Sequence, residues 1–119
     1  MKYFLATAAC LLAATSSAAE SLPRIEIYMP TPCLACIEWG VHLMDHGFVV
    51  NYRETTDMAT LKQRLHVPTE VTSVHTATVA GYFIEGHVPA DDIKELLREK
   101  PPALGLAVPG LPRGAPGRE

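Results

Sequence analysis

The sequence has no surplus of positive charge and no strong charge bias of either sign. It contains 10 lysine and arginine residues against 13 aspartate and glutamate residues, for a formal net charge of -3 at pH 7. Such a chain has no excess of positive charge that would bind a phosphate backbone, so we do not expect nucleic acid as a partner. It also lacks a Gly-rich phosphate loop and a Gly-x-Ser-x-Gly elbow, the sequence signatures of common nucleotide-binding proteins and hydrolases.

Long hydrophobic runs are also missing. The apolar stretch at residues 3–14 is too short to cross a bilayer, which takes about 20 residues. It follows the positive charge of Lys2 and precedes the small residues 15–19, which is the pattern of a secretory signal peptide. We therefore expect residues 1–19 to be removed after Ala19 and the protein to be exported to the periplasm, with no stable membrane insertion.

Cysteine is scarce, and the expected cleavage makes it scarcer. Of three cysteines, only Cys33 and Cys36 lie beyond the signal segment. Lipidation at Cys10 is an alternative, but only a few apolar residues precede this cysteine, which argues against it. The chain is 48% hydrophobic, so residues 20–100 can bury one modest core and form a single domain.

The spacing of apolar residues predicts the element order β-α-β-α-β-β-α. Strands are expected at residues 24–29, 48–54, 76–80 and 82–85, and helices from Cys33 to Gly47, from Asp57 to Val67 and over residues 91–100. A strand-helix-strand start predicts a parallel pair, and the later hairpin adds antiparallel strands, which is the thioredoxin-like α/β plan. Residues 101–119 hold five prolines and four glycines, and we expect them to form an extended tail.

In the first predicted helix, Ile37, Val41 and Met44 recur three and four residues apart. We expect Ile37 and Val41, together with Trp39, to line the core or the site, without a polar partner for the tryptophan.

The main chemical signal is the Cys-x-x-Cys motif of Cys33 and Cys36 at the start of that helix. A helix N-terminus stabilises the thiolate form of cysteine, and thiolate is both the nucleophile of disulfide exchange and a ligand of soft metals. The spacing alone therefore leaves three alternatives open: metal binding, disulfide exchange and an inert structural disulfide.

His75 shifts that balance. In thioredoxin-like oxidoreductases a cis-proline faces the two cysteines, and here His75 is expected to hold that place, directly before the third strand. An imidazole beside two thiolates predicts a Cys/Cys/His metal site made of Cys33, Cys36 and His75. Met29 and His87 are candidate fourth ligands, although we expect core packing for Met29 and a solvated turn for His87.

Two further histidines, His42 and His46, lie four residues apart on the first predicted helix. That spacing allows a surface metal pair, but two solvated side chains are the plainer expectation.

Several segments together resemble the bacterial domain-of-unknown-function family 411. The resemblance is carried by residues 33–36 (Cys-Leu-Ala-Cys), Trp39, and residues 73–76, 81–89 and 105–110. The resemblance implies an exported, thioredoxin-like, metal-binding protein that is associated with copper handling.

The chain also departs from that family at four sulfur positions. Family members read Cys-Gly-Cys-Cys and Ser-Cys-His-Thr where this chain has Ala35 and Val74 in place of cysteine. Near the C-terminus the family motif begins and ends with methionine, where this chain has Leu111 and Arg118. If the family site uses those sulfurs, the affinity for a soft ion such as Cu(I) is reduced here.

These observations predict a periplasmic, soft-metal binding protein that acts in metal storage, buffering or delivery. Copper as Cu(I) is the expected metal, zinc is an alternative, and the expected partner is a metal ion and a periplasmic metal-handling protein. We expect binding and no enzymatic activity. The rival interpretations are a thiol-disulfide oxidoreductase that uses Cys33 and Cys36, and a degenerate family member with a structural disulfide.

Overall fold

The computed structural model describes residues 2, 9–10, 12–13, 21–110 and 113–116. Most of the predicted signal segment and the predicted cleavage site after Ala19 lie outside the described residues. Within the described part of the chain, no helix is long and apolar enough to cross a membrane.

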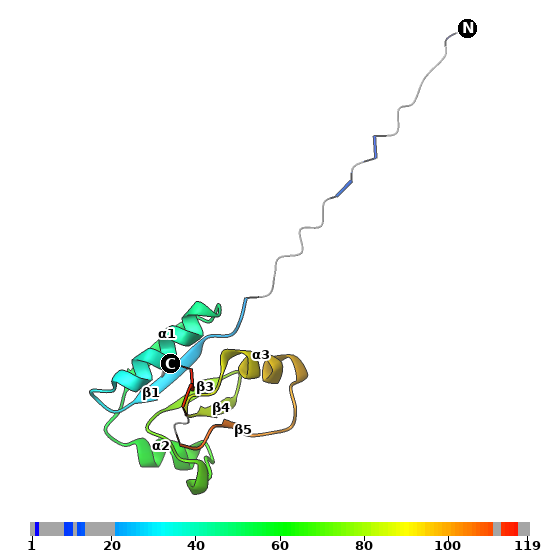
Figure 1. The fold of residues 1–119 in the computed structure, drawn as a ribbon. Coiled ribbons are helices and arrows are strands. Elements are labelled where there is room, and N and C mark those ends of the chain that lie inside the picture. The colour runs from blue at the N-terminus through cyan, green and yellow to red at the C-terminus, as the bar shows by residue number, and fades with distance from the viewer. Residues whose placement is uncertain (1, 3–8, 11, 14–20, 111–112, 117–119) are drawn as a thin grey trace.

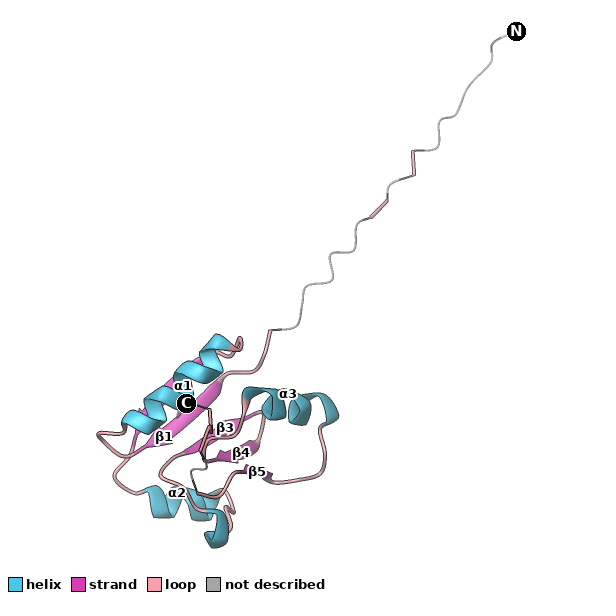
Figure 2. Cartoon of the chain, in the orientation of Figure 1, coloured by secondary structure: helices cyan, strands magenta, loops and turns pink. Residues whose placement is uncertain are grey.

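The elements follow the predicted order, with a short 3-10 turn and a fifth strand in addition (Figures 1 and 2). They are β1 (Ile25–Met29), α1 (Leu34–Asp45), β2 (Val50–Glu54), α2 (Met58–Arg64), η1 (Thr69–Val71), β3 (Thr76–Val79), β4 (Tyr82–Glu85), α3 (Ala90–Glu99) and β5 (Gly105–Ala107).

The five strands form one mixed sheet in the order β2-β1-β3-β4-β5. β1 pairs with β2 in parallel and with β3 in antiparallel, β3 and β4 form the predicted hairpin, and β5 runs parallel to β4. The helix α1 is the crossover between the parallel strands β1 and β2. Figure 1 shows α1 and α3 on one side of the sheet and α2 on the other.

Local sequence signals explain where several elements begin and end. Asp57 caps α2 as predicted, since its carboxylate accepts the backbone N–H of Thr60 at 3.1 Å. The β3–β4 hairpin turns at Ala80 and Gly81, both with positive φ, as its tight turn requires. Lys100 ends α3 in the left-handed conformation.

The core lies between the sheet and the pair of helices α1 and α3. It joins buried residues of the three central strands to Trp39 and Leu43 of α1 and to Ile93 and Leu96 of α3. The prediction that Ile37 and Val41 line the core or the site is wrong for the core, because both side chains are exposed. The buried face of α1 consists of Cys36, Trp39, Gly40 and Leu43.

The C-terminal segment departs from the predicted extended tail. Gly105–Ala107 forms β5, and the pairing extends on both sides, because Phe83 N–H donates to the Leu104 carbonyl and Val108 N–H donates to the Glu85 carbonyl, both at 3.0 Å. Further along, Ala115 is buried. The strand itself contains no proline, and its single glycine, Gly105, is compatible with a short strand at the edge of the sheet.

Candidate functional site

The two cysteines of the motif are joined by a disulfide at the start of α1. Cys33 is the N-cap residue and is half-buried, while Cys36 lies in the first turn and is fully buried. The Cys36 backbone N–H donates to Cys33 Sγ at 3.2 Å. The helix N-terminus therefore points a donor at the more accessible sulfur, which is the placement that stabilises a thiolate after reduction.

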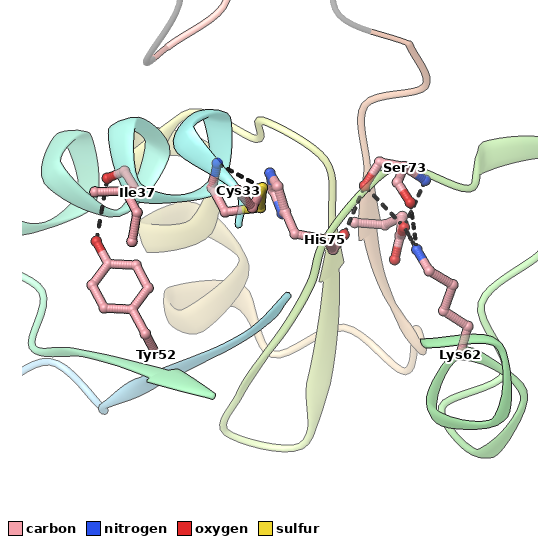
Figure 3. Close-up of a disulfide and its surroundings, with 8 residues drawn as sticks. Cys33, Ile37, Tyr52, Lys62, Ser73 and His75 are labelled. Atoms are coloured by element: carbon pink, nitrogen blue, oxygen red, sulfur yellow. Dashed lines mark hydrogen bonds and ion pairs between the residues drawn. A yellow bond between two sulfur atoms is a disulfide. The ribbon is translucent and has the colours of Figure 1, made fainter. Parts of the chain in front are cut away.

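His75 lies directly before β3, and its side chain extends toward the disulfide (Figure 3). The ring is fully buried and stacks on Trp39, with ring centroids 4.7 Å apart and an interplanar angle of 18°. Burial lowers the pKa of His75 to about 3, and the charges of His87 and Lys62 act in the same direction. The imidazole is therefore neutral at physiological pH.

Three imidazole nitrogens in this region are buried without a hydrogen-bond partner among the described residues. They are Nδ1 and Nε2 of His75 and Nε2 of His87. A buried polar atom without a partner costs free energy, so such atoms are rare in folded proteins and often mark functional positions. The neutral His75 ring carries a proton on one of its two nitrogens, so the other has a lone pair that can bind a ligand.

His87 is part of the same cluster, and the prediction of a solvated turn residue is wrong. Its ring is buried, with its centroid 5.0 Å from that of His75 and 6.3 Å from that of Trp39. Its Nδ1 lies 2.6 Å from the carbonyl oxygen of Pro116. Because a carbonyl only accepts, Nδ1 carries the proton of this contact, and in the neutral ring the lone pair lies on Nε2.

Trp39 anchors this cluster to the core. It is fully buried, and its indole N–H donates to the Val88 carbonyl at 2.9 Å. The prediction that Trp39 lines the core or the site is confirmed, but the tryptophan does have a polar partner.

The disulfide prevents the two cysteines from binding a metal ion as thiolates. Bonded to each other, Cys33 and Cys36 carry no thiolate, and among the described residues no group of three or more His, Cys, Asp and Glu side chains is able to hold a metal ion. The ligand set Cys33, Cys36 and His75 thus stays a prediction for the reduced protein. Reduction would add two thiolates beside the neutral imidazole of His75, whose nitrogens have no hydrogen-bond partner among the described residues.

The other candidate ligands lie elsewhere. Met29 is buried at the end of β1, as expected for core packing. His42 Nε2 accepts the backbone N–H of Ala90 at 3.0 Å, and His46 Nδ1 lies 2.8 Å from the His42 carbonyl oxygen. The His42 bond connects α1 to the start of α3, so the expectation of a solvated side chain is wrong for His42, whereas His46 is exposed.

Sequence reasoning missed a buried ion pair beside the site. Glu85, at the end of β4, is fully buried and pairs with Lys62 of α2. Figure 3 shows Lys62 and Ser73 next to the backbone of His75. The available signal was the alternation of β4, which places the side chain of Glu85 on the same face of the strand as that of Phe83.

Comparison with known proteins shows the family. Residues 71–118 match the model of the family described as "Protein of unknown function, DUF411". A solved structure titled Form 1 of the copper resistance protein CopG is 43% identical, with a TM-score of 0.77 over 82% of this chain and 78% of that chain. The chain belongs to the DUF411 family.

The match to this DUF411 relative also confirms the thioredoxin-like α/β fold. Form 2 of the same copper resistance protein is 43% identical as well, with a TM-score of 0.78 and the same shares of both chains. A comparison with curated proteins finds no match. The family resemblance predicted from the motifs is therefore confirmed.

Proposed function

We propose that the reduced protein binds copper as Cu(I) through Cys33, Cys36 and His75, and that it acts in copper storage, buffering or delivery in the periplasm. The observation that carries the proposal is the set of buried, unpartnered imidazole nitrogens beside the cysteine pair. The name of the solved relatives, copper resistance protein, supports the metal. We propose a binding function and not an enzyme.

The chemistry of these donors suits a soft metal ion. Thiolates and imidazole bind Cu(I) well, and a neutral imidazole has a lone pair that no proton occupies. His75 satisfies that condition because its pKa is lowered to about 3. The Nε2 atom of His87 is a candidate fourth donor, and four donors of this kind would also suit Zn(II) in a tetrahedral site.

A competition titration tests this proposal. Reduced protein is titrated with Cu(I) under anaerobic conditions against a competing chelator, and the same is done for His75→Ala. His46→Ala is the matched control, because it removes an exposed imidazole from the end of α1. We expect stoichiometric binding that is weakened at least tenfold in His75→Ala alone. Equal affinity in both variants would show that the three-ligand site is wrong.

The disulfide itself favours a second candidate, a thiol-disulfide oxidoreductase. Cys33 is the more accessible sulfur and Cys36 is fully buried, which is the asymmetry of an attacking and a resolving cysteine. In such an exchange, two thiols of a substrate protein would be oxidised to a disulfide while the Cys33–Cys36 bond is reduced to two thiols.

The reduction potential separates the remaining alternatives. A potential above about -300 mV with exchange activity and no Cu(I) binding would indicate the oxidoreductase. A potential below about -300 mV without Cu(I) binding would indicate a structural disulfide. Tight Cu(I) binding by the reduced protein supports the metal site.

A further inference from the structure

We propose that the buried carboxylate of Glu85 is a positioning residue for His75. It anchors the chain on both sides of the histidine and thereby fixes where the imidazole lies relative to the cysteines. This inference rests on the proposed function of His75 as a metal ligand.

The carboxylate of Glu85 is held in place by the donors around it. Its side chain is fully buried, and its Oε1 atom pairs with the Lys62 ammonium and accepts the backbone N–H of Ser73 at 2.7 Å. Its Oε2 atom accepts the hydroxyl of Thr76 at 2.6 Å. A buried carboxylate is costly unless donors surround it, and these donors leave it a single favourable position.

These donors flank His75. Ser73 lies two residues before the histidine, and Thr76 follows it directly and faces Glu85 in the pairing of β3 with β4. The hydroxyl of Ser73 lies 2.7 Å from the His75 carbonyl oxygen and 2.9 Å from Glu85 Oε1. Lys62 also donates to the Ser73 carbonyl at 2.7 Å. The carboxylate and its partner thus hold the backbone before and after His75.

The imidazole of His75 has no hydrogen bond of its own among the described residues. Its placement depends on its stack against Trp39 and on the backbone that carries it. Since Trp39 is fixed by the core, movement of the segment 73–76 would move the ring along the indole and away from the cysteines. A well-placed ligand needs such support, because a metal site loses affinity when its outer hydrogen bonds are removed.

The test compares the positions of the His75 ring in metal-free protein. Thr76→Val removes the hydroxyl that binds Glu85 without changing the shape of the side chain, and Glu85→Gln removes the carboxylate charge. Thr78→Val is the matched control. Thr78 lies on the same face of β3 as Thr76 and, in the part of the chain that the structure describes, makes no hydrogen bond to Glu85. Thr76→Ser restores the hydroxyl.

The NMR shifts of the His75 ring protons report the position, because the stacked indole shifts them upfield. We expect Thr76→Val and Glu85→Gln to move these shifts, and Thr78→Val and Thr76→Ser to leave them as in the wild type. If Thr76→Val does not fold, Ser73→Ala replaces it, since Ser73 is only half-buried. Unchanged shifts in both network variants would overturn the inference.

A Cu(I) titration of the same variants connects position to binding. We expect Thr76→Val and Glu85→Gln to bind Cu(I) about tenfold more weakly than Thr78→Val, by the usual effect of removing outer-shell support. Moved ring shifts with unchanged Cu(I) affinity would overturn the positioning role. A wild-type protein that does not bind Cu(I) would overturn the proposed function instead, while the ring shifts would still decide whether Glu85 fixes His75.

Discussion

His75 combines two features that disfavour a purely structural role. It is fully buried, and both of its ring nitrogens lack a partner among the described residues. A histidine selected for packing alone would be replaced at little cost by an apolar aromatic residue of similar shape. Stacking on Trp39 keeps the ring in place, and the unpartnered nitrogens keep it available to a ligand.

The depressed pKa of His75 predicts a loss of stability in acid. The folded value is about 3 and the unfolded reference is about 6.5, so the unfolded chain binds more protons between these pH values. The stability from this group is complete above about pH 6.5 and is lost as the pH falls toward 3. His75→Phe keeps an aromatic ring on Trp39 but cannot titrate.

Urea unfolding at pH 7 and pH 4 checks this prediction. We expect the free energy of unfolding of the wild type to fall more than that of His75→Phe, with a difference on the order of a few kcal/mol. The same decrease in both proteins would contradict the assigned cause.

At this scale the sequence was sufficient to predict that Cys33, Cys36 and His75 lie together, because the short motif and its place relative to the strands indicate it. Their role as metal ligands stays a prediction. The sequence was insufficient for His87, whose burial depends on the carbonyl of Pro116, a contact that spans 29 residues. Glu85 was missed for a similar reason, since its partner Lys62 lies on another element, 23 residues earlier in the chain.

Among the elements, α1 shows that helical spacing alone does not identify the buried face of a helix. It carries apolar residues on two neighbouring stripes, and the exposed stripe, which includes Ile37 and Val41, fits helical spacing as well as the buried one does. The deciding residue is Gly40, whose missing side chain leaves room for Tyr52 of β2. The Tyr52 hydroxyl lies against Gly40 and donates to the Ile37 carbonyl at 3.2 Å.

Gly40→Ala therefore distinguishes helix propensity from packing. On propensity alone, alanine inside a helix is about 1 kcal/mol more favourable than glycine. A Cβ atom at this position would overlap the Tyr52 hydroxyl, so we expect destabilisation by about 1–3 kcal/mol instead. The urea midpoint of unfolding measures the sign, and an increase would contradict the packing described here.

For the whole molecule, the C-terminal segment completes both the sheet and the site. β5 extends the sheet beside β4, and the chain then returns so that Ala115 is buried and Pro116 contacts His87. Composition predicted an extended tail because proline and glycine disfavour regular structure. It could not show that a three-residue strand would pair in parallel with residues 22 positions earlier in the chain.

Two truncations test the contribution of this segment to the proposed site. A chain that ends after Gly110 keeps β5 but loses the Pro116 carbonyl that contacts His87, whereas a chain that ends after Arg118 keeps both. We expect only the shorter chain to lose Cu(I) affinity, by about tenfold, as for other outer-shell contacts. Equal affinity in the two truncated chains would show that Pro116 does not support the site.

Export is a separate prediction at this scale. Mass spectrometry of the protein recovered from the periplasm should give a chain that begins at Glu20. A chain that retains Met1, or one that carries lipid on Cys10, would contradict the signal peptide proposed for residues 1–19.

The most direct measurement for the central claim is X-ray absorption spectroscopy of the reduced protein loaded with one equivalent of Cu(I). We expect two sulfur neighbours and at least one imidazole nitrogen neighbour per copper ion, with the nitrogen signal weakened in His75→Ala. A copper ion with only sulfur neighbours, or with no sulfur neighbour, would contradict a site made of Cys33, Cys36 and His75.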